Sequence, residues 1–121
     1  MNYEFDNERP IYIQLVEKLR IEIITGHYKP GERLPSVREL SLKTRVNPNT
    51  MQKALSELEN DLLIYTERTN GKYITNDIKL IEQAKKNLAQ DKVYKYLTDM
   101  SSIGIDYEEA IKYLKELGGN K

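Results

Sequence analysis

Two helix-start signals lie close together in this chain, and they constrain its fold more than any other feature. Ser36 is followed three residues later by Glu39, which is the pattern of a capping box, where each side chain accepts a hydrogen bond from the other residue's backbone N–H. Asn47-Pro48 is a second start signal, because Asn caps helices and Pro is tolerated in their first turn. The first helix must therefore end by about Thr44. Two short helices joined by a tight turn predict a helix-turn-helix.

Hydrophobic spacing predicts which faces of the helices are buried. Residues 10–24 form an amphipathic helix with apolar residues at steps of four, and Pro30-Gly31 after it predicts a type II turn. The helix after Ser36 is expected to bury Val37 and Leu40, with Leu42 as a further candidate. The next helix runs to about Asn60, and its expected inward residues are Met51, Ala54, Leu55 and Leu58.

Beyond Asp61 the chain predicts a β-hairpin. Residues 63–68 and 72–75 are rich in strand-forming types, and Asn70-Gly71 between them favours a two-residue type I′ turn. Three helices followed by a hairpin form a winged helix-turn-helix, a mainly α fold with one small hairpin. We place this domain at residues 1–76, its helix-turn-helix core at about 36–55 and its wing at about 63–75.

After Asn76 the pattern is helical. A long amphipathic helix is expected over about residues 77–101, and a shorter one over residues 107–117, capped by Asp106 and closed by Gly118-Gly119. One short helix cannot bury the whole apolar stripe of the long one, so residues 77–121 either join a partner chain or pack on their own winged domain. We favour a dimerisation tail, with dimerisation residues Ile78, Ile81, Leu88, Leu97 and Leu114.

The outward face of the helix that begins at Pro48 is suited to DNA. Asn and Gln can bond adenine bidentately, and Thr can contact a thymine methyl group or a phosphate. Arg38 on the preceding helix can anchor a phosphate, and the hairpin tip can approach phosphates or a minor groove. The helix residues concerned are Asn49, Thr50, Gln52 and Lys53, and those of the tip are Arg68, Asn70, Gly71 and Lys72. A merely solvated surface and a winged-helix module that binds protein are the alternatives.

Charge is distributed unevenly along the chain. The 19 basic and 19 acidic residues give a formal net charge of zero, which on average counts against a polyanionic partner. Residues 29–53, however, hold six basic and two acidic residues, whereas residues 54–67 hold four acidic and no basic ones. The predicted helix-turn-helix therefore carries a local basic face.

Several classes of function are not expected. The chain has no cysteine and a single histidine, His27, so a thiol nucleophile or a His-based metal site or triad is excluded. Residues 26–31 have the glycine spacing of a P-loop, but Glu32-Arg33 follows where Lys and Ser or Thr are required. We expect no enzyme activity and no cofactor. The acidic start and the lack of an apolar run of about 20 residues predict a cytoplasmic protein without membrane association.

Residues 31–40 and 46–55, followed by Leu58-Glu59 and the hairpin, resemble the DNA-binding domain of GntR-family bacterial transcription regulators. The resemblance spans about residues 9–76. It implies DNA contact by Arg38, by residues 47–53 and by the glycine of the wing. The complete predicted DNA-binding set is Ser36, Arg38, Asn47, Pro48, Asn49, Thr50, Gln52, Lys53, Arg68, Asn70, Gly71 and Lys72.

The remaining 77–121 segment is too short for an enclosed ligand pocket and resembles the tail of the YtrA subfamily, which serves as a dimerisation element. The resemblance implies a homodimeric repressor on a palindromic operator, with a transporter operon as the suggested target. It leaves open a small-molecule effector at the dimer interface or a protein partner as the switch.

Overall fold

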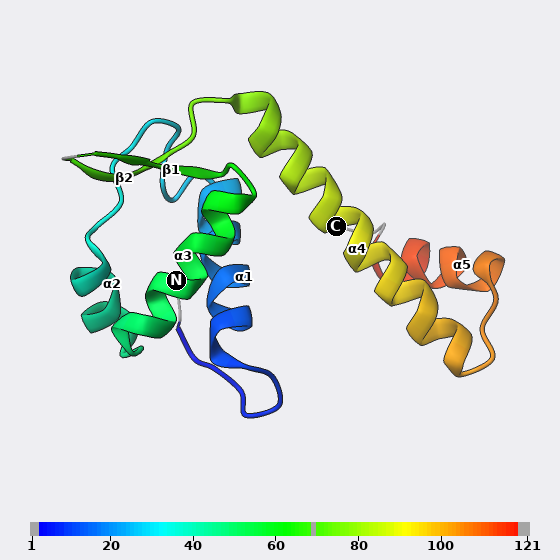
Figure 1. Ribbon diagram of the computed structural model, residues 1–121. Helices are drawn as coiled ribbons and strands as arrows, with labels where there is room; N and C mark the ends of the chain where they lie inside the picture. Colours follow the sequence, from blue (N-terminus) through cyan, green and yellow to red (C-terminus); the bar gives the residue numbers. More distant parts are fainter. Residues whose placement is uncertain (1–2, 69, 119–121) are drawn as a thin grey trace. The chain divides into compact units, whose positions relative to one another are not determined.

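The computed structural model describes residues 3–68 and 70–118 (Figure 1). Its elements are α1 (Ile11–Ile24), α2 (Val37–Thr44), α3 (Pro48–Asn60), β1 (Ile64–Glu67), β2 (Gly71–Ile74), α4 (Ile78–Ser102) and α5 (Tyr107–Gly118). The chain forms two compact units, residues 1–84 and 85–121. Three helices followed by an antiparallel hairpin confirm the winged helix-turn-helix in the first unit. No described helix is long and apolar enough to cross a membrane.

The local start signals act as the sequence predicts. Ser36 Oγ accepts a hydrogen bond from Glu39 N at 3.1 Å, and Ser36 N donates to Glu39 Oε1 at 3.2 Å, which completes the capping box. Asn47 caps α3, because its Oδ1 accepts from Asn49 N at 2.8 Å. The type II turn before α2 is confirmed by the left-handed Gly31, whose φ is +78°.

One hydrophobic core joins α1, α2, α3, the hairpin and the start of α4. Its fully buried large side chains include Leu15, Leu19, Leu40, Met51, Leu55, Leu58, Leu63, Ile64 and Ile74. The inward position expected for Leu42 is wrong, since this side chain is 72% exposed. Two residues along a helix correspond to a rotation of about 200°, so Leu42 lies opposite Leu40. Ser41 and Thr44 take the remaining buried positions of α2.

The hairpin register differs from the predicted one. Ile64 pairs with Ile74 and Glu67 pairs with Gly71, so three residues, 68–70, connect the strands and the two-residue Asn70-Gly71 turn is wrong. Both isoleucines are buried, and pairing them directly places both on the core face. Core burial therefore outweighs the local turn preference of Asn-Gly.

A short stretch before α2 pairs with β2 on the side of the hairpin away from β1. Gly31 N donates to Ile74 O at 3.0 Å, and Leu34 N donates to Lys72 O at 2.8 Å. Between these bonds, Arg33 forms an isolated antiparallel bridge with Tyr73. The segment in front of α2 is thereby held in register with β2 (Figure 1).

The second unit is built from the C-terminal part of α4 and from α5. Asp106 caps α5, because its Oδ1 accepts from Glu109 N at 2.9 Å. The Tyr96 hydroxyl donates to Ala110 O at 2.7 Å, and Ala110 is fully buried. Gly118 is the last residue of α5, and Gly119, predicted to close this helix, lies outside the described residues.

Candidate nucleic-acid interface

Helix α3 separates its buried and outward residues cleanly. Met51, Ala54, Leu55 and Leu58 face the core and are almost fully buried. On the outward side, Asn49, Gln52 and Lys53 are exposed and Thr50 is half-buried. The structure therefore brings the four predicted base-reading residues together on the N-terminal half of one helix.

The first turn of α1 flanks this surface. Lys53 Nζ lies 3.8 Å from the centroid of the Tyr12 ring, a cation–π contact that holds the ammonium group beside α1. A shallow groove next to it is lined by Ile11, Tyr12, Asn49, Thr50 and Lys53. Sequence reasoning assigned no role to Tyr12, because nothing in its local pattern indicates that α1 reaches Lys53.

Three predicted contact residues also have structural tasks. The hydroxyl oxygen of Ser36 and the amide oxygen of Asn47 accept backbone hydrogen bonds at the starts of α2 and α3, and Pro48 occupies the first turn of α3. These bonds use the acceptor oxygens, so the donors that the two side chains can offer are the hydroxyl proton of Ser36 and the side-chain amide hydrogens of Asn47. Arg38 is exposed in the first turn of α2, with no hydrogen bond or ion pair to another described residue.

In the wing, Lys72 is engaged within the protein. Its Nζ lies 3.0 Å from Glu59 Oε1 and donates to Thr66 Oγ1 at 3.0 Å, and the side chain is only 16% exposed. The hydrogen bond from Lys72 lowers the pKa of Glu59 below its usual value, against the opposing effect of burial. Lys72 thus ties the wing to α3, whereas Arg68 and Asn70 at the tip are exposed.

Two exposed cations near this surface were absent from the predicted set. Arg33 lies beside Gly71 of the wing, and Arg45 occupies the turn between α2 and α3 with a left-handed φ of 59°. Both belong to the basic stretch of residues 29–53. The excess of basic residues in this stretch includes both arginines, but the sequence pattern does not show where they lie relative to the wing and α3.

The predicted dimerisation residues lie in different surroundings. Ile78 and Leu114 are each 51% exposed, and Leu88 and Leu97 are half-buried. Ile81 is 8% exposed and belongs to the core of the first unit, which leaves little of it for a partner chain. Further apolar residues are exposed on the second unit: Val93, Tyr94, Ile103, Tyr107, Tyr113 and Leu117.

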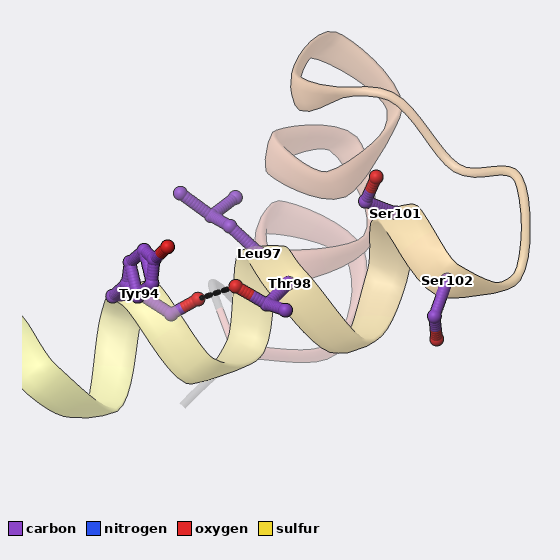
Figure 2. A pocket seen from close by; sticks show the side chains of 5 residues that line it. All are labelled: Tyr94, Leu97, Thr98, Ser101 and Ser102. Carbon is purple, nitrogen blue, oxygen red and sulfur yellow. Dashed lines mark hydrogen bonds between the residues drawn. The ribbon is translucent and has the colours of Figure 1, made fainter.

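A shallow hollow lies on α4 within the second unit. Figure 2 shows its lining residues, Tyr94, Leu97, Thr98, Ser101 and Ser102. The Thr98 hydroxyl is used inside the helix, where it donates to Tyr94 O at 2.8 Å (Figure 2). In the part of the chain that the structure describes, no group of three or more His, Cys, Asp or Glu side chains could hold a metal ion.

Comparison with known proteins shows the family to which a chain with this winged helix-turn-helix belongs. Residues 11–74 match the family model of bacterial regulatory proteins, gntR family. The chain belongs to the GntR family. This GntR protein is 33% identical over 112 residues to the HTH-type transcriptional repressor YtrA of Bacillus subtilis, covering 92% of this chain and 86% of that protein.

Solved structures agree with the family assignment. A GntR family transcriptional regulator from Listeria monocytogenes has a TM-score of 0.87 and 43% identity, covering 93% of this chain and 99% of that one. The DNA-binding domain of AraR in complex with operator ORX1 has a TM-score of 0.56 and 25% identity, covering 60% of this chain and 93% of that one. This GntR protein is therefore a DNA-binding transcription regulator and not an enzyme, and the resemblance seen in the sequence is confirmed.

Proposed function

We propose that this GntR protein is a cytoplasmic homodimeric repressor that occupies an inverted-repeat operator and blocks transcription. The observation that carries the proposal is the outward face of α3, where Asn49, Gln52 and Lys53 lie together opposite a buried apolar face. Amides can bond base edges in the major groove, and a lysine can bond guanine or a phosphate. The exposed Arg38 on α2 adds a cation for the phosphate backbone.

Dimerisation is supported by the apolar surface of the second unit. Tyr94, Tyr113, Leu114 and Leu117 are about half exposed or more, and covering them would remove apolar area from water. A two-fold dimer would present two copies of α3 to half-sites about 34 Å, or a multiple of that distance, apart. The tail would set this spacing.

The target and the switch follow from the resemblance to YtrA. We propose a transporter operon as the regulated target, with a small molecule or a protein partner as the signal. The hollow lined by Tyr94 and Leu97 offers apolar surface together with hydroxyl groups. A ligand bound there would act by changing the geometry of the dimer.

The competing function, a winged-helix module that binds protein, receives less support. Such a module would need apolar side chains on the exposed face of α3. The exposed residues of that helix are instead polar or charged, namely Asn49, Gln52, Lys53, Ser56, Glu57 and Asn60, together with Pro48 at its start. This composition favours DNA over an apolar protein groove.

Binding to the DNA upstream of the protein's own gene tests the proposal. Gel-shift and anisotropy titrations of the full chain are expected to give a complex whose affinity falls steeply as salt rises, because bound phosphates release counterions. A scrambled fragment of equal length and base composition is the control and should bind more weakly. Salt-insensitive binding, or no binding, would refute the proposed function.

A further inference from the structure

Arg33 is held in the wing by backbone pairing, although it lies far from the hairpin in the sequence. It bridges Tyr73 of β2, between the bonds from Gly31 N to Ile74 O and from Leu34 N to Lys72 O. Paired residues on neighbouring strands point to the same face of a sheet, and alternate residues along a strand share a face. Arg33 therefore shares the outer face of the wing with Tyr73 and Gly71.

The Arg33 guanidinium lies next to Gly71. A Cβ built on Gly71 would lie 3.4 Å from both Nε and Nη2 of Arg33, the distance of a van der Waals contact. Gly71 also has a φ of +97°, a conformation that residues with a side chain rarely adopt. Since Gly71 adjoins the connection of residues 68–70, this contact brings a cation to the tip of the wing.

The charge of Arg33 is available to an outside partner. Its side chain is exposed, and within residues 3–68 and 70–118 no hydrogen bond or ion pair engages it. The positive charge of Arg33 acts weakly on Glu39. The pKa of Glu39 is lowered mainly by hydrogen bonds from Ser36 and to a smaller extent by the charge of Arg33. Glu39 is itself engaged in the capping box.

Lys72, by contrast, would lose internal bonds if it turned to DNA. Its ammonium group contacts both Glu59 and Thr66 at 3.0 Å, so a phosphate would have to replace an existing ion pair. An arginine additionally offers a planar set of donors that matches two phosphate oxygens. Of the two cations flanking Gly71, Arg33 is the one free to bind.

We propose that Arg33 is a phosphate contact of the wing, placed beside Gly71 by the backbone pairing of its segment with β2, and that Lys72 is a structural residue. This inference rests on the proposed DNA-binding function and adds a residue outside the hairpin to it. The ligand is a backbone phosphate of double-stranded DNA. The contact stabilises binding without selecting bases.

The test is anisotropy titration over a potassium chloride series with the upstream fragment and its scrambled counterpart. Arg33→Gln is expected to lower affinity about tenfold, and to reduce the slope of log K against log salt by about 1 per bound protomer, on both DNAs. Arg33→Lys keeps the charge and should restore the slope. The double variant Glu59→Gln with Lys72→Gln removes one negative and one positive charge together. The net charge is therefore unchanged, and the variant should keep the wild-type slope.

The results separate the inference from the function on which it rests. If the wild-type protein binds with a salt-dependent affinity but Arg33→Gln keeps both affinity and slope, the role of Arg33 is refuted and the proposed function stands. A lowered slope in the Glu59 and Lys72 double variant alone would assign the contact to Lys72 instead. If the wild-type protein does not bind DNA, both proposals fall. Thermal melting of Arg33→Gln close to wild type, expected for an exposed side chain, would show that its loss of affinity is not unfolding.

Discussion

Glu22 and His27 meet at the C-terminal end of α1, where Glu22 Oε2 lies 3.2 Å from His27 Nε2. The Glu22 side chain is almost completely buried, and its other oxygen accepts a hydrogen bond from the Tyr3 hydroxyl. Within the described residues, Oε2 has no hydrogen bond of good geometry. Burial raises the pKa of Glu22 above its usual value, although nearby positive charge at His27 and Lys43 works in the opposite direction.

This burial predicts a specific pH dependence of stability. Because the pKa of Glu22 is higher in the folded state, the folded state binds the proton more tightly, and the free energy of unfolding falls as pH rises above the unfolded value of 4.5. Glu22→Gln keeps an acceptor for Tyr3 and removes the buried charge. We expect it to raise the free energy of unfolding at pH 7 by about 1 kcal/mol and to flatten this pH dependence, as measured by urea unfolding between pH 4 and 8.

Glu57→Gln is the matched control, since Glu57 is an exposed carboxylate and its replacement should change stability little. A lower stability of Glu22→Gln at pH 7 would contradict the prediction and would indicate that the pair with His27 outweighs the cost of burial.

Replacing Arg38 and replacing Gln52 are expected to affect DNA binding in different ways. Arg38→Ala removes a phosphate contact and should weaken binding to the upstream and scrambled fragments alike, with the salt slope reduced by about 1 per protomer. Gln52→Ala removes a base contact and should cost about 1–3 kcal/mol on the upstream fragment only. Anisotropy on both fragments measures the two effects, and equal behaviour of the variants would show the role assignment to be wrong.

Ser36 combines a helix cap with a predicted phosphate contact. Ser36→Ala loses the bond to Glu39 N and should lower the free energy of unfolding by about 1 kcal/mol. Ser36→Asp retains an acceptor for the cap but places a negative charge at the DNA surface. The Asp variant should therefore be the more stable of the two and the weaker in DNA binding, as measured by urea unfolding and anisotropy. If Ser36→Asp bound DNA as well as wild type, Ser36 would have no neighbouring phosphate.

Leu114 tests the role of the second unit. It is half exposed on α5, so Leu114→Asp should leave the fold intact while it disfavours an apolar interface. We expect sedimentation analysis to show dissociation to monomers at concentrations where wild type is dimeric, together with at least about tenfold weaker binding to the upstream fragment. Lys112→Asp introduces the same residue at another exposed position of α5 and should remain dimeric if the interface is local to Leu114. An unchanged assembly of Leu114→Asp would exclude this part of α5 from the interface.

Most of the helical architecture could be predicted from the sequence. The capping residues Ser36, Asn47 and Asp106 act on backbone groups two or three positions away, so the relevant geometry is contained in the local sequence. The inward face of α3 could be predicted for a similar reason, since a helix repeats about every 3.6 residues. Leu42 shows the limit of this reasoning, because its hydrophobic side chain does not by itself determine the side of α2 on which it lies.

The hairpin shows where local preference yields to the core. Asn70-Gly71 has the composition of a tight turn, yet Ile64 and Ile74 are paired and buried, and this pairing sets a three-residue connection. Burial of two large apolar side chains contributes more than the preference of one turn type. Turn chemistry predicted the hairpin correctly and its register wrongly.

The sequence by itself determined the order of the elements, the face that α3 presents and the family, because those depend on residues that are neighbours along the chain. Only the tertiary structure decided that Lys72 is engaged within the protein and that Arg33 lies beside the wing. Lys72 is engaged because α3 brings Glu59 within 3.0 Å of it, and Arg33 reaches Gly71 because backbone bonds join the segment before α2 to β2. Ionic contacts depend on distance and burial in three dimensions, so the sequence alone could not show that Lys72 is paired with Glu59 or that Arg33 lies beside the hairpin.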